Sequence, residues 1–313
     1  MMSNPLVSVI IPNYNRAVYI SDCIQSVYDQ IHRPIELIVV DDGSTDNSIQ
    51  IITNCQNKLS NHTDFKIIIL KQKNAGAPVA RNHGFRKSKG EYIQFLDSDD
   101  LLLPHKIASQ INAFSEAIDV VYSRAQFFNE VPNNLMDKYW GRIPKGNSSD
   151  YFEFPWQTMC ALYKKTILDE FGVWQENLSF SQDWEFAMRY KIKSRVEFLD
   201  EISALYRDHK GDRVGNNLSV QKINSLTSVL LKTYTLSKEN DLIDNYLKKR
   251  YFSRLTYCFM QSGALGGYVE KIKVWRTLVE INRLKAILLI PLIFAGKSVF
   301  KFFLKVFKKI AYN

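Results

Sequence analysis

The 313-residue chain has few cysteines and lacks the common phosphate-binding and nucleophile motifs. The four cysteines lie far apart and form no CxxC pair: Cys23, Cys55, Cys160 and Cys258. We therefore expect reduced, buried thiols rather than a disulfide framework or a zinc site. A Walker A loop and a GxGxxG fingerprint are also missing, which argues against P-loop and dinucleotide-binding chemistry. Neither a serine elbow nor a Cys–His signature is evident.

Acidic residues are absent from the C-terminal segment 281–313, which contains seven lysines and arginines. The formal net charge of the whole chain is +9, so most of the excess lies in this segment. A basic body would suggest a nucleic-acid partner, whereas a basic tail suggests a membrane surface or a disordered arm. We therefore expect no nucleic-acid partner.

The tail also lacks an apolar run long enough to span a bilayer, because its uncharged stretch 286–296 has 11 residues and a span needs about 20. In the following stretch, 297–311, four lysines recur on one helical face and five apolar side chains lie opposite. This pattern is typical of a helix in the membrane interface that directs its lysines to anionic head groups. The alternative is a helix packed on the rest of the protein.

The N-terminus has no basic region, and its apolar run is too short for a signal peptide. Together with the tail, this predicts a cytoplasmic protein that associates peripherally with the inner face of the cell membrane.

Short apolar runs alternate with segments of helical periodicity in the first hundred residues. The expected strands are 6–12, 35–41, 66–72 and 91–97, and the expected helices are 17–30, 46–59 and 77–88. Continuously apolar strands are buried on both faces, so they predict a parallel, doubly wound α/β sheet. In such sheets ligands bind outside the carboxyl ends of the strands. The clusters PNYNR, DDGSTD and DSDD all follow strands, so they should meet at that edge.

The pattern is weaker in the rest of the chain. We interpret 124–155 as a loop insertion over the site, 156–172 as ordered again, 181–194 as a helix capped by Ser181, and 217–280 as helical. The predicted organisation is an α/β domain over 1–215, a helical extension over 216–280 and a basic amphipathic tail over 281–313.

Asp97 and Asp99 form a DxD pair at the end of the fourth expected strand. Alternate residues of a strand share a face, so the two carboxylates can converge on one point. Mg²⁺ in proteins often binds one or two carboxylates and shares its coordination sphere with substrate phosphates. A cation there would offset the repulsion among three closely spaced acids. The alternative is an acidic turn that caps the helix beginning near Pro104.

Other polar residues fall near the same expected edge. Asp41 and Asp42 precede a glycine turn and could bind a base or ribose, or could merely cap a helix. Arg81, in NAGAPVARN, could pair with a phosphate or with the acids. Asp183 opens a helix beside Trp184, where it could act as a general base or only stabilise the helix N-terminus.

Five motifs follow one another in the order strand-PNYNR, strand-DDGS, NAGAPVARN, strand-LDSDD and QDWEFAMR. This order, across about residues 5–210, resembles that of family 2 glycosyltransferases of the bacterial surface-polysaccharide type. The resemblance implies the inverting GT-A fold, a Rossmann-like, mostly parallel sheet flanked by helices, here with a C-terminal helical extension. It also implies transfer of a sugar from a nucleotide-sugar donor, most simply a UDP-sugar, to a glycan or lipid-linked acceptor. Mg²⁺ or Mn²⁺ would be the cofactor.

The resemblance also implies roles for single residues. Pro12, Tyr14 and Asn15 would line the nucleotide pocket; Asp41 would accept a hydrogen bond from uracil, with Asp42 close by; Arg81 would lie near the diphosphate; Asp97 would contact ribose or a metal-bound water; and Asp99 would ligate the metal. Asp183 would be the catalytic base, although Gln182 replaces the glutamate usual before it. His209 is carried over as a further candidate metal ligand.

Two alternative functions remain at this point. A haloacid-dehalogenase-type phosphatase also uses a DxD after a strand, but it needs Thr or Val where this chain has Leu101. A non-catalytic, membrane-associated protein that binds a nucleotide-sugar or glycan would hold the donor without releasing UDP, so turnover separates it from an enzyme.

Overall fold

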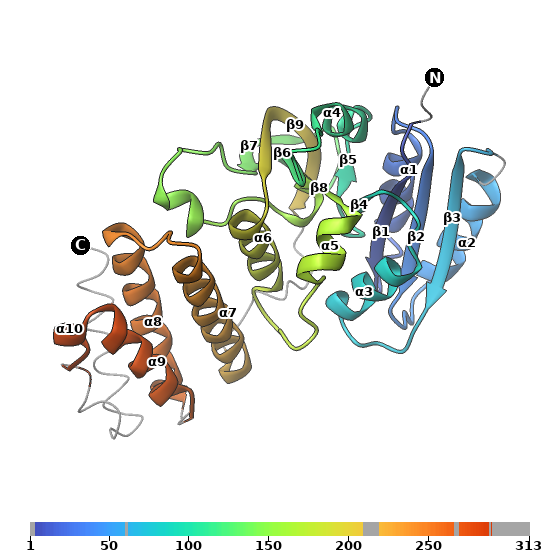
Figure 1. Ribbon diagram of the computed structural model, residues 1–313. Helices are drawn as coiled ribbons and strands as arrows, with labels where there is room; N and C mark the ends of the chain where they lie inside the picture. Colours follow the sequence, from blue (N-terminus) through green and yellow to red (C-terminus); the bar gives the residue numbers. More distant parts are fainter. Residues whose placement is uncertain (1–3, 60–61, 209–218, 266–268, 288, 290–313) are drawn as a thin grey trace. The chain divides into compact units, whose positions relative to one another are not determined.

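The computed structural model describes residues 4–59, 62–208, 219–265, 269–287 and 289 (Figure 1). The chain divides into two compact units. Unit 1 comprises Met1–Pro144, Phe154–Glu176 and Lys193–Lys210, and unit 2 comprises Lys145–Glu153, Asn177–Ile192 and Gly211–Asn313. The predicted organisation, with boundaries near 215 and 280, stays a prediction.

The N-terminal part of unit 1 has the predicted alternation of strands and helices. The first four strands lie side by side and parallel in the order β3-β2-β1-β4 (Figure 1). Every residue of the first two strands is buried, as expected for parallel strands covered on both faces. The elements are β1 (Val7–Asn13), α1 (Ile20–Tyr28), β2 (Ile35–Asp41), α2 (Ser48–Leu59), β3 (Phe65–Lys71), α3 (Ala77–Lys87) and β4 (Tyr92–Phe95).

Helix α3 packs closely on strands β1 and β2. A glycine in the helix permits this approach, because a Cβ added to Gly84 would meet Cγ2 of Ile10 at 2.5 Å. Helices α1 and α2 contact each other. Asp46 begins α2 by accepting a hydrogen bond from the Ser48 backbone N–H (2.9 Å), in agreement with one of the two predicted caps.

Beyond β4 the same nine-stranded sheet continues as β8-β6-β9-β5, with β7 paired to β6. Here β6 and β9 are parallel, whereas β8, β5 and β7 run antiparallel to their neighbours. The added elements are β5 (Leu101–Leu102), α4 (Lys106–Ala113), β6 (Val120–Asn129), β7 (Leu135–Trp140), the short helix Thr158–Cys160, β8 (Ala161–Lys164), α5 (Lys165–Phe171) and β9 (Val196–Asp208).

The prediction of a loop over 124–155 is wrong for its first half. Residues 124–129 complete β6, and 135–140 form β7, which pairs with it as a hairpin. Phe127 and Phe128 are buried, so the aromatic residues of this segment belong to the core. The short turn between the strands contains Pro132 and Asn133, and such residues interrupted the apolar pattern that identifies strands.

The described part of unit 2 is helical, and the helices predicted over 217–280 are confirmed within 219–265 and 269–280. Its elements are the short helix Ser148–Tyr151, α6 (Gln182–Lys193, the last residue of which clusters with unit 1), α7 (Val220–Glu239), α8 (Asn245–Leu265), α9 (Val269–Ile281) and α10 (Arg283–Ile287). Ser219 caps α7, because its Oγ accepts a hydrogen bond from the Lys222 backbone N–H (3.2 Å).

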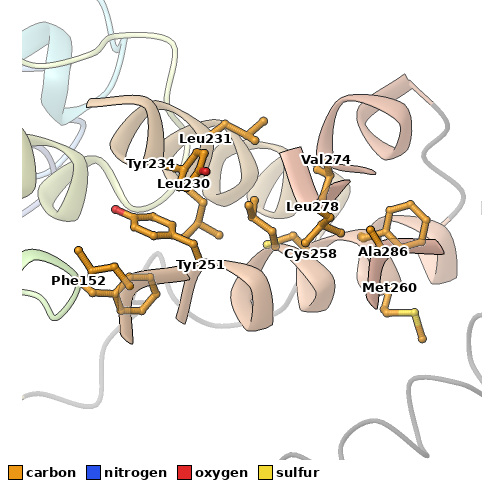
Figure 2. Packing of buried hydrophobic residues seen from close by; sticks show 13 residues of the cluster. Phe152, Leu230, Leu231, Tyr234, Tyr251, Cys258, Met260, Val274, Leu278 and Ala286 are labelled. Atoms are coloured by element: carbon orange, nitrogen blue, oxygen red, sulfur yellow. The ribbon is translucent and has the colours of Figure 1, made fainter. Parts of the chain in front are cut away.

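Helices α7 to α10 enclose a second apolar core. Figure 2 shows its side chains gathered between these helices, with Phe152 joining from the end of the short helix. The buried members are Phe152, Leu230, Leu231, Tyr234, Leu247, Tyr251, Leu255, Cys258, Phe259, Met260, Val274, Leu278 and Ala286. Within the described part of the chain, no helix combines the length and apolar character needed to cross a membrane. The predicted interfacial helix, 297–311, lies outside the described residues, as does all of the predicted tail beyond residue 289.

Candidate functional site

The carboxyl ends of β1 and β2 place several of the predicted nucleotide-pocket residues side by side in unit 1. Asn13 lies in register with Asp41, and its Nδ2 donates to Oδ1 of Asp41 (3.1 Å). The other carboxylate oxygen of Asp41 accepts from the Ser44 backbone N–H (3.1 Å). Asn15, which has a φ of 50°, accepts from the Thr45 backbone N–H (2.8 Å). These bonds join the PNYNR and DDGST segments.

Pro12 and Tyr14 flank this junction along the chain. Pro12 is buried at the end of β1, whereas Tyr14 exposes 45% of its surface. An exposed aromatic ring next to such polar side chains is suited to stacking on a planar base.

Asp42, the second acid of the DDGSTD segment, builds the loop that precedes α3. One carboxylate oxygen accepts from Nε2 of Gln72 (2.8 Å) and from the Ala75 backbone N–H (2.9 Å), and the other accepts from the Gly76 backbone N–H (2.8 Å). Asp42 is buried. Its carboxylate therefore fixes the start of the helix that carries Arg81.

The acidic segment lies in a turn after β4 and not within the strand. The strand ends at Phe95, and the Asp100 backbone N–H donates to the Asp97 carbonyl (3.1 Å). The expectation that strand alternation directs both DxD carboxylates to one face is therefore wrong. Asp97 pairs with Nη2 of Arg81 (2.5 Å), and Asp99 lies 3.4 Å from Nε of Arg16.

Arg81 is almost fully buried and lies against an aromatic ring. Its guanidinium carbon is 4.1 Å from the centroid of the Trp174 ring. Its Nη2 donates to Asp97. Its other two nitrogens, Nε and Nη1, have no hydrogen-bond partner among the described residues. Buried N–H groups without acceptors are unfavourable, so this site favours an added anionic oxygen.

Asn82 holds Trp174 in place, and neither residue was among the predicted site residues. The Asn82 side chain donates to the Trp174 carbonyl (2.9 Å) and accepts from its backbone N–H (3.0 Å). Asn82 also donates to Oε1 of Glu176 (2.9 Å). The asparagine follows Arg81 directly in the ARN motif, so that motif was the available signal. Nothing in the sequence around Trp174 pointed to the site.

Arg207, near the end of β9, is a further residue that sequence reasoning missed. Its backbone N–H donates to Oδ1 of Asp100 (2.9 Å), and its Nε donates to the Asp99 carbonyl (2.9 Å). Its Nη2 lies 3.3 Å from Oδ2 of Asp22, and its Nη1 donates to the Glu130 carbonyl. Arg207 lies in the segment YRDHKGDR, in which only His209 was a predicted site residue, and His209 lies outside the described residues.

Two buried groups, one in the acidic turn and one in contact with it, have raised pKa values. Burial, followed by the charges of Asp99 and Asp97, raises the pKa of Asp100 well above its usual range, while Arg207 acts in the opposite direction. Burial, then the three neighbouring aspartates, also raises the pKa of the Cys23 thiol. Its Sγ donates to the Asp97 carbonyl (3.4 Å), so the thiol stays protonated.

The acids of the turn fit a divalent cation that is shared with a substrate. Across the described ranges, no three His, Cys, Asp or Glu side chains are grouped as a protein-only metal site. Asp97 and Asp99 are both partly exposed, with 32% and 20% of their side chains accessible. One or two accessible carboxylates, completed by water and phosphate oxygens, are the usual protein contribution to an Mg²⁺ site of this kind.

Asp183, the predicted base, lies in unit 2 at the start of α6. Its Oδ1 accepts from the Trp184 backbone N–H (2.8 Å). Ser181 immediately precedes the helix, as predicted, with a φ of 57°, and its carbonyl accepts from the Glu185 N–H (3.0 Å). Glu185 in turn pairs with Arg189 (2.8 Å) in a buried contact one helical turn apart. The predicted approach of Asp183 to the donor site stays a prediction.

Comparison with known proteins agrees with this architecture. Residues 8–172 match the family described as glycosyl transferase family 2. An uncharacterized glycosyltransferase of Rickettsia typhi is 28% identical over 277 residues, which cover 85% of this chain and 83% of the relative. Three longer Rickettsia relatives also match, and the matched regions are less than half of their length.

Two solved structures share the fold. TarS residues 1–349 of S. aureus, in complex with UDP-GlcNAc, superposes with a TM-score of 0.64 at 20% identity, covering 88% of this chain and 81% of the 1–349 chain. The mannosyltransferase PcManGT of Pyrobaculum calidifontis, in complex with GDP-Man and Mn²⁺, gives 0.58 at 15% identity, covering 98% and 85%. These likenesses confirm the predicted GT-A fold.

Proposed function

The chain belongs to glycosyl transferase family 2, and from this premise we propose that it transfers a sugar from a nucleoside-diphosphate sugar, with UDP the expected nucleotide. The acceptor is a glycan or a lipid-linked glycan precursor, and the anomeric configuration inverts. The observation that carries the proposal is the acidic turn and, beside it, the buried Arg81, whose Nε and Nη1 have no hydrogen-bond partner within the described residues. A diphosphate would accept hydrogen bonds from Arg81, and its cation would bind the carboxylates of the turn.

The base and the diphosphate of the donor would bind at adjoining parts of the same sheet edge. Asp41, held by Asn13 and Ser44, offers a carboxylate to the base. Arg81 would bind the diphosphate, while Asp97 and Asp99 would hold Mg²⁺ or Mn²⁺ against it. The donors bound in TarS and PcManGT, UDP-GlcNAc and GDP-Man, support a nucleoside-diphosphate sugar as the donor class.

Proton transfer is assigned to Asp183. A sugar hydroxyl is a weak nucleophile at neutral pH, and a positioned carboxylate increases its reactivity by removing the proton as the bond to the anomeric carbon forms. The diphosphate leaves from the opposite face and gains negative charge, which the Arg81 guanidinium stabilises. A bound divalent cation would supply Lewis-acid stabilisation of the same charge. No covalent enzyme intermediate is needed.

Calorimetric titration with UDP, with and without Mn²⁺, tests the donor site. We expect binding that strengthens about tenfold or more with Mn²⁺, and we expect Asp99→Ala to abolish this metal-dependent gain. Asp200→Ala removes an exposed acid of β9 that pairs with Arg124 and serves as the matched control. A wild-type protein that binds neither UDP nor, in the same assay, GDP or dTDP would refute the proposal. Release of UDP from a UDP-sugar separates an enzyme from a binding protein.

We further propose that the C-terminal segment attaches the enzyme to an anionic membrane surface at the cytoplasmic face. The amphipathic lysine pattern of 297–311 supports this. In the described part just before it, α10 exposes 81% of Leu284 next to the basic residues Arg283 and Lys285.

Flotation with vesicles tests the attachment. The full chain should float with vesicles rich in phosphatidylglycerol and not with neutral phosphatidylcholine vesicles, and 0.5 M salt should weaken the binding. Replacing four lysines with glutamate, at 297, 301, 305 and 308, should abolish it. Equal flotation of the wild type and this variant would contradict the proposed role of the tail.

A further inference from the structure

Arg207 lies against the acidic turn but is shielded from solvent. Only 3% of its side chain is accessible. Its guanidinium carbon is 4.9 Å from the Tyr19 ring centroid and 4.6 Å from that of Phe128. An arginine enclosed in this way is in no position to bind the donor itself.

The contacts of Arg207 join segments that are far apart in the sequence. They reach the Asp99 carbonyl, a carboxylate oxygen of Asp100, Asp22 on α1 and the Glu130 carbonyl after β6. Strand β9 itself is held in place around Arg207, because Phe128 pairs with Arg207 and Leu101 pairs with Leu205. Arg207 therefore joins the turn to β9, to α1 and to the residue after β6.

Arg207 binds a different part of the turn from Arg81 and Arg16, the two other arginines that contact it. Arg81 and Arg16 pair with the carboxylates of Asp97 and Asp99. Arg207 binds the backbone carbonyl of Asp99, so this bond persists when the carboxylate takes a new ligand. Three bonds in diverging directions require a planar guanidinium, and a lysine ammonium cannot reproduce them.

We propose that Arg207 is a positioning residue that holds the 97–100 turn in the conformation in which Asp99 binds the metal–diphosphate group of the donor. This inference rests on the proposed function. It predicts an effect on metal-dependent nucleotide affinity that is transmitted through Asp99, without contact between Arg207 and the donor.

The test compares Arg207→Lys with Arg33→Lys in the full-length protein. Arg33 is a matched control: it also donates to backbone carbonyls, those of Tyr28, Gln30 and His32, and also lies over aromatic rings. It has none of the contacts with the acidic turn. Melting temperature measures the structural cost of each change, and titration with UDP with and without Mn²⁺ measures the effect on the site.

We expect Arg207→Lys to weaken UDP binding about tenfold in the presence of Mn²⁺ and less than about twofold in its absence. Arg33→Lys should leave both affinities unchanged at a comparable loss of melting temperature. In an Asp99→Ala background, Arg207→Lys should have no further effect on UDP binding, because the two residues act through one interaction. In turnover, the donor KM should rise more than kcat falls.

Two results would overturn the inference about Arg207 and leave the proposed function untouched. One is an equal loss of UDP affinity with and without Mn²⁺, and the other is an undiminished effect of Arg207→Lys in the Asp99→Ala background. If Arg207→Lys does not fold, Asp22→Asn replaces it, because the Asp22 side chain is 54% accessible and contacts Arg207 directly. That variant should show a two- to threefold, metal-dependent loss, and no loss would count against the inference. A wild type that binds no nucleoside diphosphate refutes the proposed function as well.

Discussion

Three arginines contact the acidic turn at residues 97–100, and they differ in how far their side chains are buried. Arg207 and Arg81 are buried, whereas a third of the Arg16 side chain is accessible. Their guanidinium groups offset the repulsion among the carboxylates of the turn before any cation binds. Of the three, Arg81 alone combines burial with two donor nitrogens, Nε and Nη1, that have no acceptor within the described residues.

Replacing Arg81 with lysine tests the value of its planar group. Arg81→Lys keeps the positive charge but loses the stacking on Trp174 and the fixed direction of the N–H donors. We expect kcat/KM for the donor to fall about 10- to 100-fold, with a melting temperature within roughly 5 °C of the wild type. Steady-state kinetics measures the first quantity and calorimetry the second. An unchanged kcat/KM would exclude Arg81 from the donor site.

Lys106, at the start of α4, is fully buried, and its Nζ has no hydrogen-bond partner within the described ranges. Burial lowers its pKa from the ordinary 10.5 to about 7, while Cys160 and Glu201 act in the opposite direction. Between pH 7 and 10.5 the unfolded chain therefore binds more protons at this residue than the folded chain does. The contribution of Lys106 to the free energy of unfolding consequently rises with pH across this window.

We expect Lys106→Met to raise the free energy of unfolding by about 2–4 kcal/mol at pH 7, because the variant has no amine to deprotonate on folding. The gain should shrink towards zero near pH 10. Urea denaturation of both proteins at several pH values measures this difference. The exposed Lys58, changed to methionine, is the control for the loss of a surface amine. A pH-independent gain for Lys106→Met would contradict the expectation.

At the scale of elements, the loop before α3 and the turn after β4 form the proposed diphosphate site together. Asp42 holds the loop by accepting three hydrogen bonds, two of them from backbone N–H groups. The loop sets the start of α3, and α3 carries Arg81 to its contact with Asp97. An acid that sequence reasoning placed near the nucleotide therefore also orders an element of the site.

Changing Asp42 to asparagine should loosen this loop. The new NH₂ group would face N–H donors, so we expect a loss of about 1–3 kcal/mol in the free energy of unfolding. Hydrogen exchange should become faster at Ala75 and Gly76, whose amides donate to Asp42. Asp46→Asn, at the cap of α2, is the control and should speed exchange at Ser48 instead. Unchanged protection of Ala75 and Gly76 would show that the loop is held by other contacts.

At the scale of the whole molecule, charge is divided unequally between the two units. Unit 2 contains 21 basic and 10 acidic residues, a net charge of +11, whereas unit 1 contains 20 and 22, a net charge of −2. The basic isoelectric point, about 9.2, is therefore a property of unit 2. Long-range attraction to an anionic surface would act on unit 2, and the sheet that carries the proposed donor site contributes nothing to it.

Proton transfer is proposed for Asp183, a residue of unit 2 whose carboxylate accepts from the Trp184 backbone N–H. We expect Asp183→Asn to lower kcat by about 10²- to 10⁴-fold, the usual contribution of a general base, and to leave UDP affinity within about twofold. Release of UDP and calorimetric titration measure the two effects. Asp169→Asn, an exposed change on α5, is the control. Parallel losses of turnover and affinity would assign Asp183 to donor binding instead.

The strands of the first half of the sheet and the helices between them were predictable because their signals are local. Unbroken apolar runs identify β1 and β2, and helical periodicity identifies α1 and α2. Strands β6 and β7 were missed because the turn residues between them interrupt the pattern, and their antiparallel pairing depends on contacts outside each strand.

The sequence by itself determined the α/β class, the order of the motifs and the edge of the sheet at which the acids lie, because apolar periodicity and the parallel strand arrangement are sufficient for these. Only the tertiary structure decided which charges meet there. The Arg207 side chain reaches the carbonyl of Asp99, 108 positions earlier in the chain, and the ring of Trp174 lies against Arg81. Such contacts depend on how β9 and the segment after α5 pack, and no local pattern encodes that packing.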